Sequence, residues 1–228
     1  LAALTGHQAW VEGVAFSRDD KTLVSISGDG VAKVWDWVPR KEMLSWQAHA
    51  KVQKRRPFAP AHAVLFLGRG SILATSGADG YVRFWKPGST YPLVSFRPSP
   101  SGDKPEHLGS LACSPDGRLL ASGSHEGWIS LWDISQEKPE ALVRWRMTNS
   151  WVGHVLFLPN GRLVASGRNG IRCWDLSDPR EPKESDGLAG RSNLDISPDG
   201  RRLVSQSLDS SSFMFWDATS GTEFPMAQ

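Results

Sequence analysis

Residues 6–36 read GHQAWVEGVAFSRDDKTLVSISGDGVAKVWD and form the unit from which the rest of the chain is built. Its ending, Val34-Trp35-Asp36, returns in looser form as Phe84-Trp85-Lys86, Leu131-Trp132-Asp133, Cys173-Trp174-Asp175 and Phe215-Trp216-Asp217. Five tryptophans therefore follow one another at intervals of 50, 47, 42 and 42 residues. These tryptophans are Trp35, Trp85, Trp132, Trp174 and Trp216. A period in the forties indicates propeller blades, solenoid turns or a tandem array.

The pattern inside the unit favours strands over helices. Apolar residues stand at positions 11, 14 and 16, then at 23, 24 and 26, then at 31, 34 and 35, in short runs separated by turn residues. The turns are Ser17-Arg18-Asp19-Asp20 and Ser27-Gly28-Asp29-Gly30, whose Asp and Gly residues suit tight turns. A fourth strand fits residues 41–46, so each unit is predicted to form four strands.

The repeated elements resemble those of the WD-repeat (Trp-Asp repeat) β-propellers. A Gly-His start, a Ser-Pro-Asp-Gly turn, a Leu-Ala-Ser-Gly-Ser strand, an Asp-Gly turn and a final Trp-Asp recur in register over nearly the whole chain. The resemblance implies an all-β fold in which four-stranded antiparallel blades surround a central channel. With five repeats visible, we expect a segment of a larger ring of about seven blades.

The expected division treats residues 1–228 as one propeller domain or segment. Residues 1–5 would be the last strand of a preceding blade, and the blades themselves would span residues 6–46, 47–96, 97–146, 147–188 and 189–228. Blade 2 carries an insertion, because 17 residues separate His49 from Phe66 whereas 9 separate His7 from Phe16.

The resemblance also implies a hydrogen-bond network in each blade, running from the Gly-His histidine through a strand Ser or Thr to the turn Asp, with the tryptophan nearby. The matching positions are His7, Ser25, Asp29 and Trp35 in blade 1; His49, Thr75, Asp79 and Trp85 in blade 2; Ser122, Glu126 and Trp132 in blade 3; Ser166 and Trp174 in blade 4; and Ser205, Asp209 and Trp216 in blade 5. Blades 3 to 5 depart from the pattern, with Thr148 and Arg191 in histidine positions. Blades 1 and 2 are therefore expected to be the most rigid.

Composition narrows the function classes only slightly. The formal net charge is +2, which implies no polyanionic partner, and nucleic acid is the less favoured one. The two cysteines, Cys113 and Cys173, are expected to be small core residues in different blades. No apolar run of about 20 residues predicts a membrane span, and we expect a cytoplasmic protein.

A catalytic interpretation of the His, Ser and Asp residues is disfavoured, because a catalytic triad is needed once and this set recurs in every blade. The six histidines show no metal-ligand spacing, and no Cys-x-x-Cys-His motif for heme is present, so we expect neither metal nor cofactor. The glycine-rich turns do not lead from a strand into a helix and do not resemble a phosphate-binding loop.

Recognition is therefore assigned to surface residues. Trp10 and Trp151 each lie 6 residues before a strand phenylalanine, a position that the resemblance places at the narrower end of the channel. An exposed tryptophan there would anchor a partner, whereas one packed on a neighbouring loop would not. The other partner-binding candidates are His107, His125 and the basic residues Lys51, Lys54, Arg55 and Arg56 of the blade 2 insertion.

The predicted function is that of a non-enzymatic scaffold that binds protein or peptide partners on the loop face around the channel. The alternative is a sensor or regulatory module of a longer chain whose kinase, protease or nucleotide-driven assembly domain lies outside this segment. Other domains of the same parent chain are then candidate partners. A third class, a propeller enzyme with a cofactor in its channel, is disfavoured for want of a heme-attachment motif.

Overall fold

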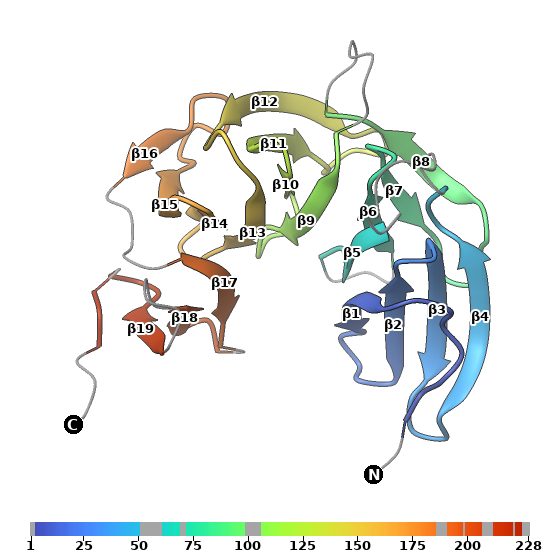
Figure 1. Cartoon of the computed structure of the whole chain (residues 1–228). Coiled ribbons are helices and arrows are strands. Elements are labelled where there is room, and N and C mark those ends of the chain that lie inside the picture. The colour runs from blue at the N-terminus through green and yellow to red at the C-terminus, as the bar shows by residue number, and fades with distance from the viewer. Residues whose placement is uncertain are drawn as a thin grey trace. The chain divides into compact units, whose positions relative to one another are not determined.

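The computed structural model describes residues 3–50, 61–68, 72–98, 106–185, 191–197, 199–206, 212–220 and 222–224. These residues form only β-strands, turns and irregular segments, and the strands make five antiparallel sheets (Figure 1). The chain divides into two compact units, Leu1–Leu111 and Ala112–Gln228, and each is described by itself. No helix that could cross a membrane occurs in the described ranges.

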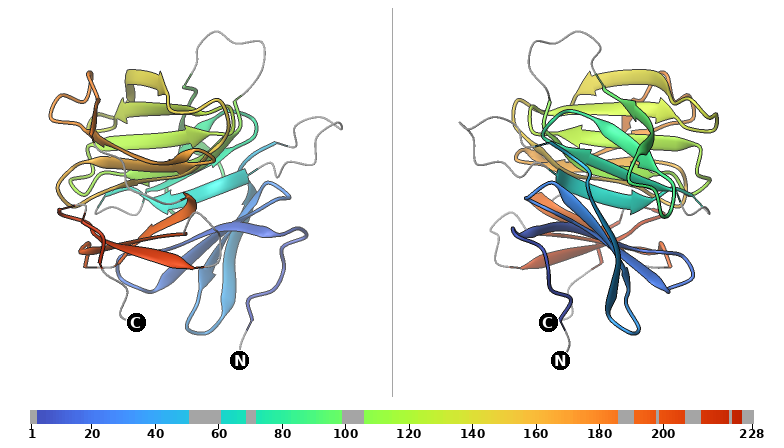
Figure 2. Two further views of the ribbon diagram at one scale, coloured as in Figure 1. Left: turned by 60° about the vertical axis from the view of Figure 1, so that its left-hand side comes forward. Right: turned by 90° about the vertical axis from the view of Figure 1, so that its right-hand side faces the viewer.

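The first unit holds the sheets of blades 1 and 2. Blade 1 has the strand order β1-β2-β3-β4 and blade 2 the order β5-β6-β7-β8, so each chain segment pairs with the next one through a hairpin. The strands are β1 (Val11–Phe16), β2 (Thr22–Ser27), β3 (Val31–Asp36), β4 (Lys41–Gln47), β5 (Ala61–Phe66), β6 (Leu73–Gly77), β7 (Val82–Trp85) and β8 (Pro92–Phe96). The sheets are twisted, as the blue strands β1–β4 show in Figure 2.

The second unit holds blades 4 and 5 and most of blade 3, whose first strand straddles the division. Blades 3 and 4 have four strands each, and blade 5 has three. The strands are β9 (Leu108–Cys113), β10 (Leu119–Ser124), β11 (Trp128–Asp133), β12 (Glu140–Arg146), β13 (Val152–Phe157), β14 (Leu163–Gly167), β15 (Gly170–Asp175), β16 (Lys183–Ser185), β17 (Arg191–Ile196), β18 (Arg202–Gln206) and β19 (Phe213–Asp217).

The first hairpin turn is closed by its own side chains in blades 1, 3 and 5. In blade 3, the hydroxyl of Ser114 donates to the carboxylate of Asp116 at 2.5 Å, and the same carboxylate accepts the main-chain N–H of Arg118 at 3.0 Å. The Ser114 oxygen then accepts the N–H of Leu119 at 2.9 Å, where β10 begins. Because Asp and Ser side chains can replace main-chain partners in this way, the Ser-Pro-Asp-Gly sequence fixes where the strand starts.

Pairs of tryptophans from neighbouring blades pack against each other. In the first unit, Trp46 of β4 packs against Trp85 of β7 with ring centroids 5.4 Å apart. In the second unit, Trp145 of β12 and Trp174 of β15 repeat the contact at 5.5 Å. Each pair lies in a cluster of buried apolar residues shared by two blades, so the core of this fold lies between sheets.

Two predicted strands differ from the structure. Residues 3–5, expected to end a preceding blade, form no strand, because a strand needs a neighbour to pair with and no earlier repeat is present in this sequence. In blade 5 the expected fourth strand is reduced, within the described residues, to a single bridge between Trp216 and Glu223. Of the two cysteines, Cys173 is buried as expected, whereas Cys113 is only half-buried.

Candidate functional site

The polar network of blade 2 is a continuous chain of hydrogen bonds. His49 lies with its Nδ1 atom 2.9 Å from Asp79 Oδ1 and its Nε2 atom 2.9 Å from Thr75 Oγ1. The indole N–H of Trp85 donates to the same Thr75 oxygen at 2.9 Å. One proton arrangement satisfies every member: the indole donates to the hydroxyl, the hydroxyl donates to Nε2, and Nδ1–H donates to the carboxylate.

Burial and charge agree with a neutral imidazole in this chain. The His49 side chain is 1% exposed, and its burial lowers the pKa of the imidazole, although the bond and charge of Asp79 oppose this effect. Burial alone would raise the pKa of Asp79, but the hydrogen bond from His49 and the charge of Arg83 outweigh it and lower the pKa. Arg83 Nη1 lies 2.7 Å from both Asp79 Oδ2 and His49 Nδ1. Since Nδ1–H points to Asp79, the guanidinium of Arg83 donates its hydrogen bond to the Asp79 carboxylate.

Blade 1 positions the histidine of blade 2. The carbonyl oxygen of Gly30, in the turn between β2 and β3, accepts the main-chain N–H groups of Ala48 at 2.9 Å and His49 at 3.1 Å. Gly30 has a φ of 82°, a conformation that favours glycine, and a Cβ atom there would overlap the carbonyl oxygen of His49. The turn thus holds His49 at the end of β4, from which its side chain reaches into the next sheet.

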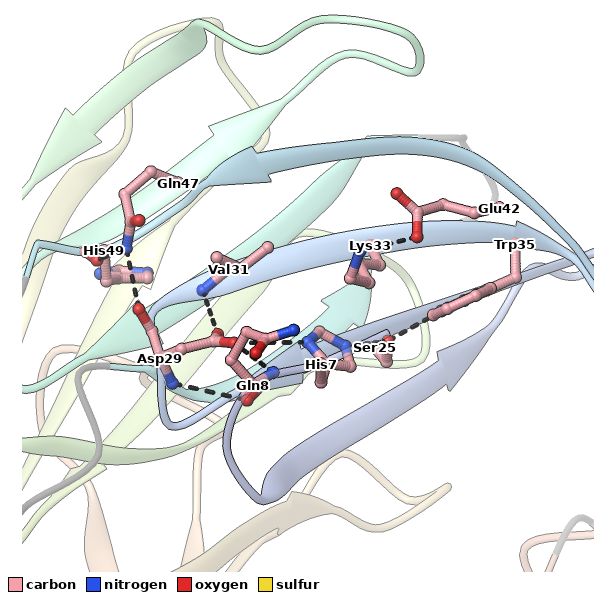
Figure 3. Close-up of polar contacts among 11 residues, drawn as sticks. His7, Gln8, Ser25, Asp29, Val31, Lys33, Trp35, Glu42, Gln47 and His49 are labelled. Carbon is pink, nitrogen blue, oxygen red and sulfur yellow. Dashed lines mark hydrogen bonds and ion pairs between the residues drawn. The ribbon is translucent and has the colours of Figure 1, made fainter. Parts of the chain in front are cut away.

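The network of blade 1 has the same parts, but the contact between its histidine and its aspartate is longer (Figure 3). His7 Nε2 lies 2.7 Å from Ser25 Oγ, which also accepts the indole N–H of Trp35 at 2.8 Å. His7 Nδ1 stays 3.9 Å from Asp29 Oδ2, beyond hydrogen-bond distance. Burial lowers the pKa of His7 against the opposing charge of Asp29.

Two differences from blade 2 accompany the longer link. The carboxylate of Asp29 accepts the main-chain N–H of Gln8 at 3.0 Å, in addition to that of Val31 at 2.9 Å, which has its counterpart in the bond from Tyr81 to Asp79. Lys33 occupies the place that Arg83 has in blade 2, but its ammonium turns to Glu42 at 2.6 Å (Figure 3). Blade 1 therefore lacks the cation that in blade 2 holds the carboxylate beside the imidazole.

The remaining blades keep fragments of the set. In blade 3, Ser122 and Trp132 are buried and Glu126 is half-buried. In blade 4, Asn169 donates to Thr148 Oγ1 at 3.3 Å, while the buried Ser166 hydroxyl has no hydrogen-bond partner among the described residues and Trp174 is buried. In blade 5, Trp216 donates to Ser205 Oγ at 3.1 Å, and Asp209 lies outside the described residues.

The surface candidates differ strongly in exposure. Trp10 is 86% exposed, and its carbonyl oxygen is held by the N–H of Gly28 at 2.9 Å. Trp151 is half-buried, with its ring so close to Gly153 that a Cβ atom there would overlap it. His107 and His125 are half-buried and take part in further interactions, and Lys51, Lys54, Arg55 and Arg56 lie outside the described residues.

Comparison with known proteins decides the family. The family model described as "WD domain, G-beta repeat" matches residues 1–36, 57–86 and 98–133, which are the first three repeats with their closing tryptophans. The chain belongs to the WD-repeat family. It is 26% identical over 178 residues to transcription initiation factor TFIID subunit 5 of Caenorhabditis elegans, an alignment that covers 77% of this chain and 25% of that protein.

Two further relatives extend the picture of WD-repeat proteins. Apoptotic protease-activating factor 1 of Rattus norvegicus is 26% identical over 215 residues, covering 75% of this chain and 16% of that protein. Nuclear distribution protein PAC1 of Arthroderma benhamiae is 27% identical over 181 residues, covering 77% of this chain and 38% of that protein. The WD-repeat chain thus spans well under half the length of these relatives.

In blade 2, the hydroxyl of Thr75 has no access to a substrate. Thr75 is fully buried, and its oxygen is already engaged by both Trp85 and His49. A nucleophile needs a cleft beside it and free donors for an oxyanion, and this hydroxyl has neither. Across the described residues, no group of three or more His, Cys, Asp or Glu side chains is arranged to hold a metal ion.

Sequence reasoning missed Arg83, which pairs with Asp79 at 2.7 Å. The signal was present, because a basic residue stands four positions after the turn aspartate in both blade 1 and blade 2 of this WD-repeat protein. Only the structure shows that Arg83 returns to the aspartate whereas Lys33 turns away to Glu42.

Proposed function

We propose that this WD-repeat protein is a non-catalytic scaffold that binds protein or peptide partners on the loop face around the channel. The observation that carries the proposal is Trp10, a large amphipathic ring that is 86% exposed. Exposed tryptophans are costly to leave in water and are enriched among the residues that dominate protein interfaces. Trp10 is also fixed in place, since the Gly28 bond ties its main chain to the turn between β2 and β3.

The buried networks serve this function as internal braces. Asp29 receives the N–H of Gln8, so the segment that leads to Trp10 is tied to the same turn. A rigid loop loses less conformational entropy when a partner binds than a flexible one does. We therefore assign His7, Ser25, Asp29 and Trp35 to positioning Trp10 and give them no contact with the partner.

The names of the relatives support a role in assembly. One is a subunit of a transcription initiation factor, and another is a protease-activating factor. Both names describe proteins that act through other proteins. Among the sequence candidates Trp10 is the strongest, because Trp151 already uses one face of its ring against Gly153.

The test compares two exposed aromatic residues of the first unit. Tyr91 is 81% exposed and lies beside β8, outside the proposed face, so Tyr91→Ala is the control for Trp10→Ala. Immobilised wild-type protein and both variants are used to capture proteins from an extract of the source cells, with quantification by mass spectrometry. We expect a set of proteins that falls at least tenfold with Trp10→Ala and stays with Tyr91→Ala. An identical set on all three proteins would contradict the proposal.

The exposed apolar residues support the proposal that these five blades belong to a larger ring of about seven. In blade 1, Val14 and Phe16 of β1 are 59% and 53% exposed, although their neighbours Val24 and Ile26 are buried against blade 2. In blade 5, Phe213 and Phe215 are exposed while Trp216 is buried against blade 4. Further blades of the parent chain would cover these faces.

Hydroxyl-radical footprinting tests the larger ring. Oxidation of Phe16 and Phe215 is measured in the 228-residue chain and in the parent chain. Strong protection in the parent chain alone is the expected result, and equal oxidation in both would contradict the larger ring.

A second function is supported by the lengths of the relatives. Because the alignments cover 16% to 38% of those proteins, this chain can serve as the regulatory module of a longer protein with an enzymatic domain elsewhere. Sequencing the parent gene is the test. A parent chain composed only of WD repeats would exclude this function.

A further inference from the structure

An apolar cavity of about 360 Å³ lies between blades 1 and 2, within the first unit. Its walls include Val34, Leu44 and Trp46 from blade 1, together with Phe66 and Leu73 from blade 2. Lys86 is the one charged residue among those that line it. Its size falls within the range of about 300 to 1,000 Å³ in which proteins bind small ligands and side chains.

Trp10 is not among the residues that line the cavity, and most of these residues lie toward the opposite strand ends. In the hairpin of β1 and β2, Val11 pairs with Ser27 near Trp10, whereas Phe16 pairs with Leu23 at the far end. Thr22, the residue before Leu23, lines the cavity at this far end. A ligand in the cavity is therefore separate from a partner bound at Trp10.

Lys86 is a departure from the repeat. The other four repeats have aspartate after the tryptophan, and in blades 3, 4 and 5 this carboxylate accepts the N–H two residues further on, at 2.8 to 2.9 Å. In blade 2 the turn forms without it, because Ser89 donates to the carbonyl oxygen of Lys86 at 3.1 Å. The exposed Lys86 ammonium makes no ion pair with another described residue, so it is available to a ligand.

Trp46 contributes apolar ring surface to the cavity. Its side chain is buried, and its indole Nε1–H is enclosed by the protein without a hydrogen-bond partner within the described part of the chain. The equivalent Trp145 shares this feature, so the enclosed donor belongs to the repeat and the lysine to blade 2 alone. Lys86 is therefore the charged group that the cavity offers to a ligand.

We propose that this cavity binds a short peptide segment in which an apolar side chain stands next to a carboxylate. The apolar side chain fills the space between Leu44 and Phe66, beside the ring of Trp46, and the carboxylate pairs with Lys86. Met43, exposed at the edge of the cavity, adapts its flexible thioether to the side chain that enters. An acidic flank gives specificity because a charged pair at the edge of an apolar site is screened less than one in open water.

Nuclear magnetic resonance on the whole chain tests the proposal with defined peptides. The probes are acetyl-Phe-Asp-amide and acetyl-Asp-Phe-amide, and the controls are the same peptides with Asn in place of Asp. The readouts are the Nε1–H signal of Trp46 and the methyl signal of Met43. We expect an Asp peptide to move both signals and to bind about tenfold more tightly than its Asn counterpart.

Three variants assign the effect. Lys86→Gln should remove the preference for Asp, whereas Lys41→Gln, a change at an exposed lysine of β4 outside the lining, should retain it. Trp10→Ala should leave peptide binding unchanged, which separates this site from the proposed function. The proposal is overturned if neither Asp peptide moves the Trp46 signal, or if the preference for Asp survives in Lys86→Gln.

Discussion

The carbonyl oxygen of Gly30 accepts the main-chain N–H of His49 at 3.1 Å, so the turn of one blade holds the histidine that braces the next. The two residues are 19 positions apart, and the whole of β3 and β4 lies between them. Adjacent blades are therefore joined by polar contacts of the main chain as well as by the tryptophan core.

Replacing Gly30 with alanine should lower the free energy of unfolding by about 2 to 4 kcal/mol, because the new Cβ atom combines a positive φ with overlap on the carbonyl oxygen of His49. Gly88→Ala is the matched control. Gly88 also has a positive φ, of 76°, but no heavy atom lies within 4 Å of the Cβ position. Its loss should stay near 1 kcal/mol. Urea unfolding measures both, and equal losses would show that steric overlap at Gly30 is unimportant.

Thr75→Val and Ser166→Ala remove equivalent hydroxyl groups from two blades and should have opposite consequences. The Thr75 oxygen holds both His49 and Trp85, so its loss leaves two buried groups without partners and should cost about 2 to 4 kcal/mol. The Ser166 hydroxyl already lacks a partner among the described residues, so Ser166→Ala should be neutral or stabilising. Thermal unfolding distinguishes the two. A large loss of stability with Ser166→Ala would reveal a bond that the described geometry does not contain.

Stability should fall as the pH drops below about 6.5, the ordinary pKa of histidine. Burial lowers the pKa of His49 and of His7 in the folded protein. Below pH 6.5 the unfolded chain therefore binds more protons than the folded chain, and this difference favours unfolding. Above about pH 7 both states are neutral and stability should be level. A further loss, at more acidic pH, should follow when the ionised Asp79, whose pKa is lowered in the folded state, becomes protonated.

Urea unfolding between pH 5 and pH 8 measures this dependence. Although His49→Gln should destabilise the protein at every pH, its slope between pH 5 and pH 7 should be shallower than that of the wild type. A wild-type profile without a slope in this range would contradict neutral buried histidines.

The repeat made most of the fold predictable. Its turns carry the residues that close them, such as Ser114 and Asp116, and its tryptophans recur at the spacing of the blades. The polar partners were less predictable. Lys33 and Arg83 occupy the same repeat position, but Lys33 pairs with Glu42 whereas Arg83 pairs with the turn aspartate, Asp79. The cavity beside Lys86 could not be predicted, because its walls come from strands of both blades, which meet only after the two sheets have packed. The spacing of residues in the sequence predicts the strands and turns within one blade well, and it predicts poorly the contacts and cavities between two blades.

We infer that the His49 set is an internal brace and that surface residues carry out recognition. Nuclear magnetic resonance of the His49 ring nitrogens between pH 5.5 and pH 8 tests this inference. We expect one neutral tautomer with the proton on Nδ1, no titration in this range and slow exchange of that proton with water. A His49 ring that titrates near pH 6.5 and exchanges freely would show that the set is open to solvent and is not an internal brace.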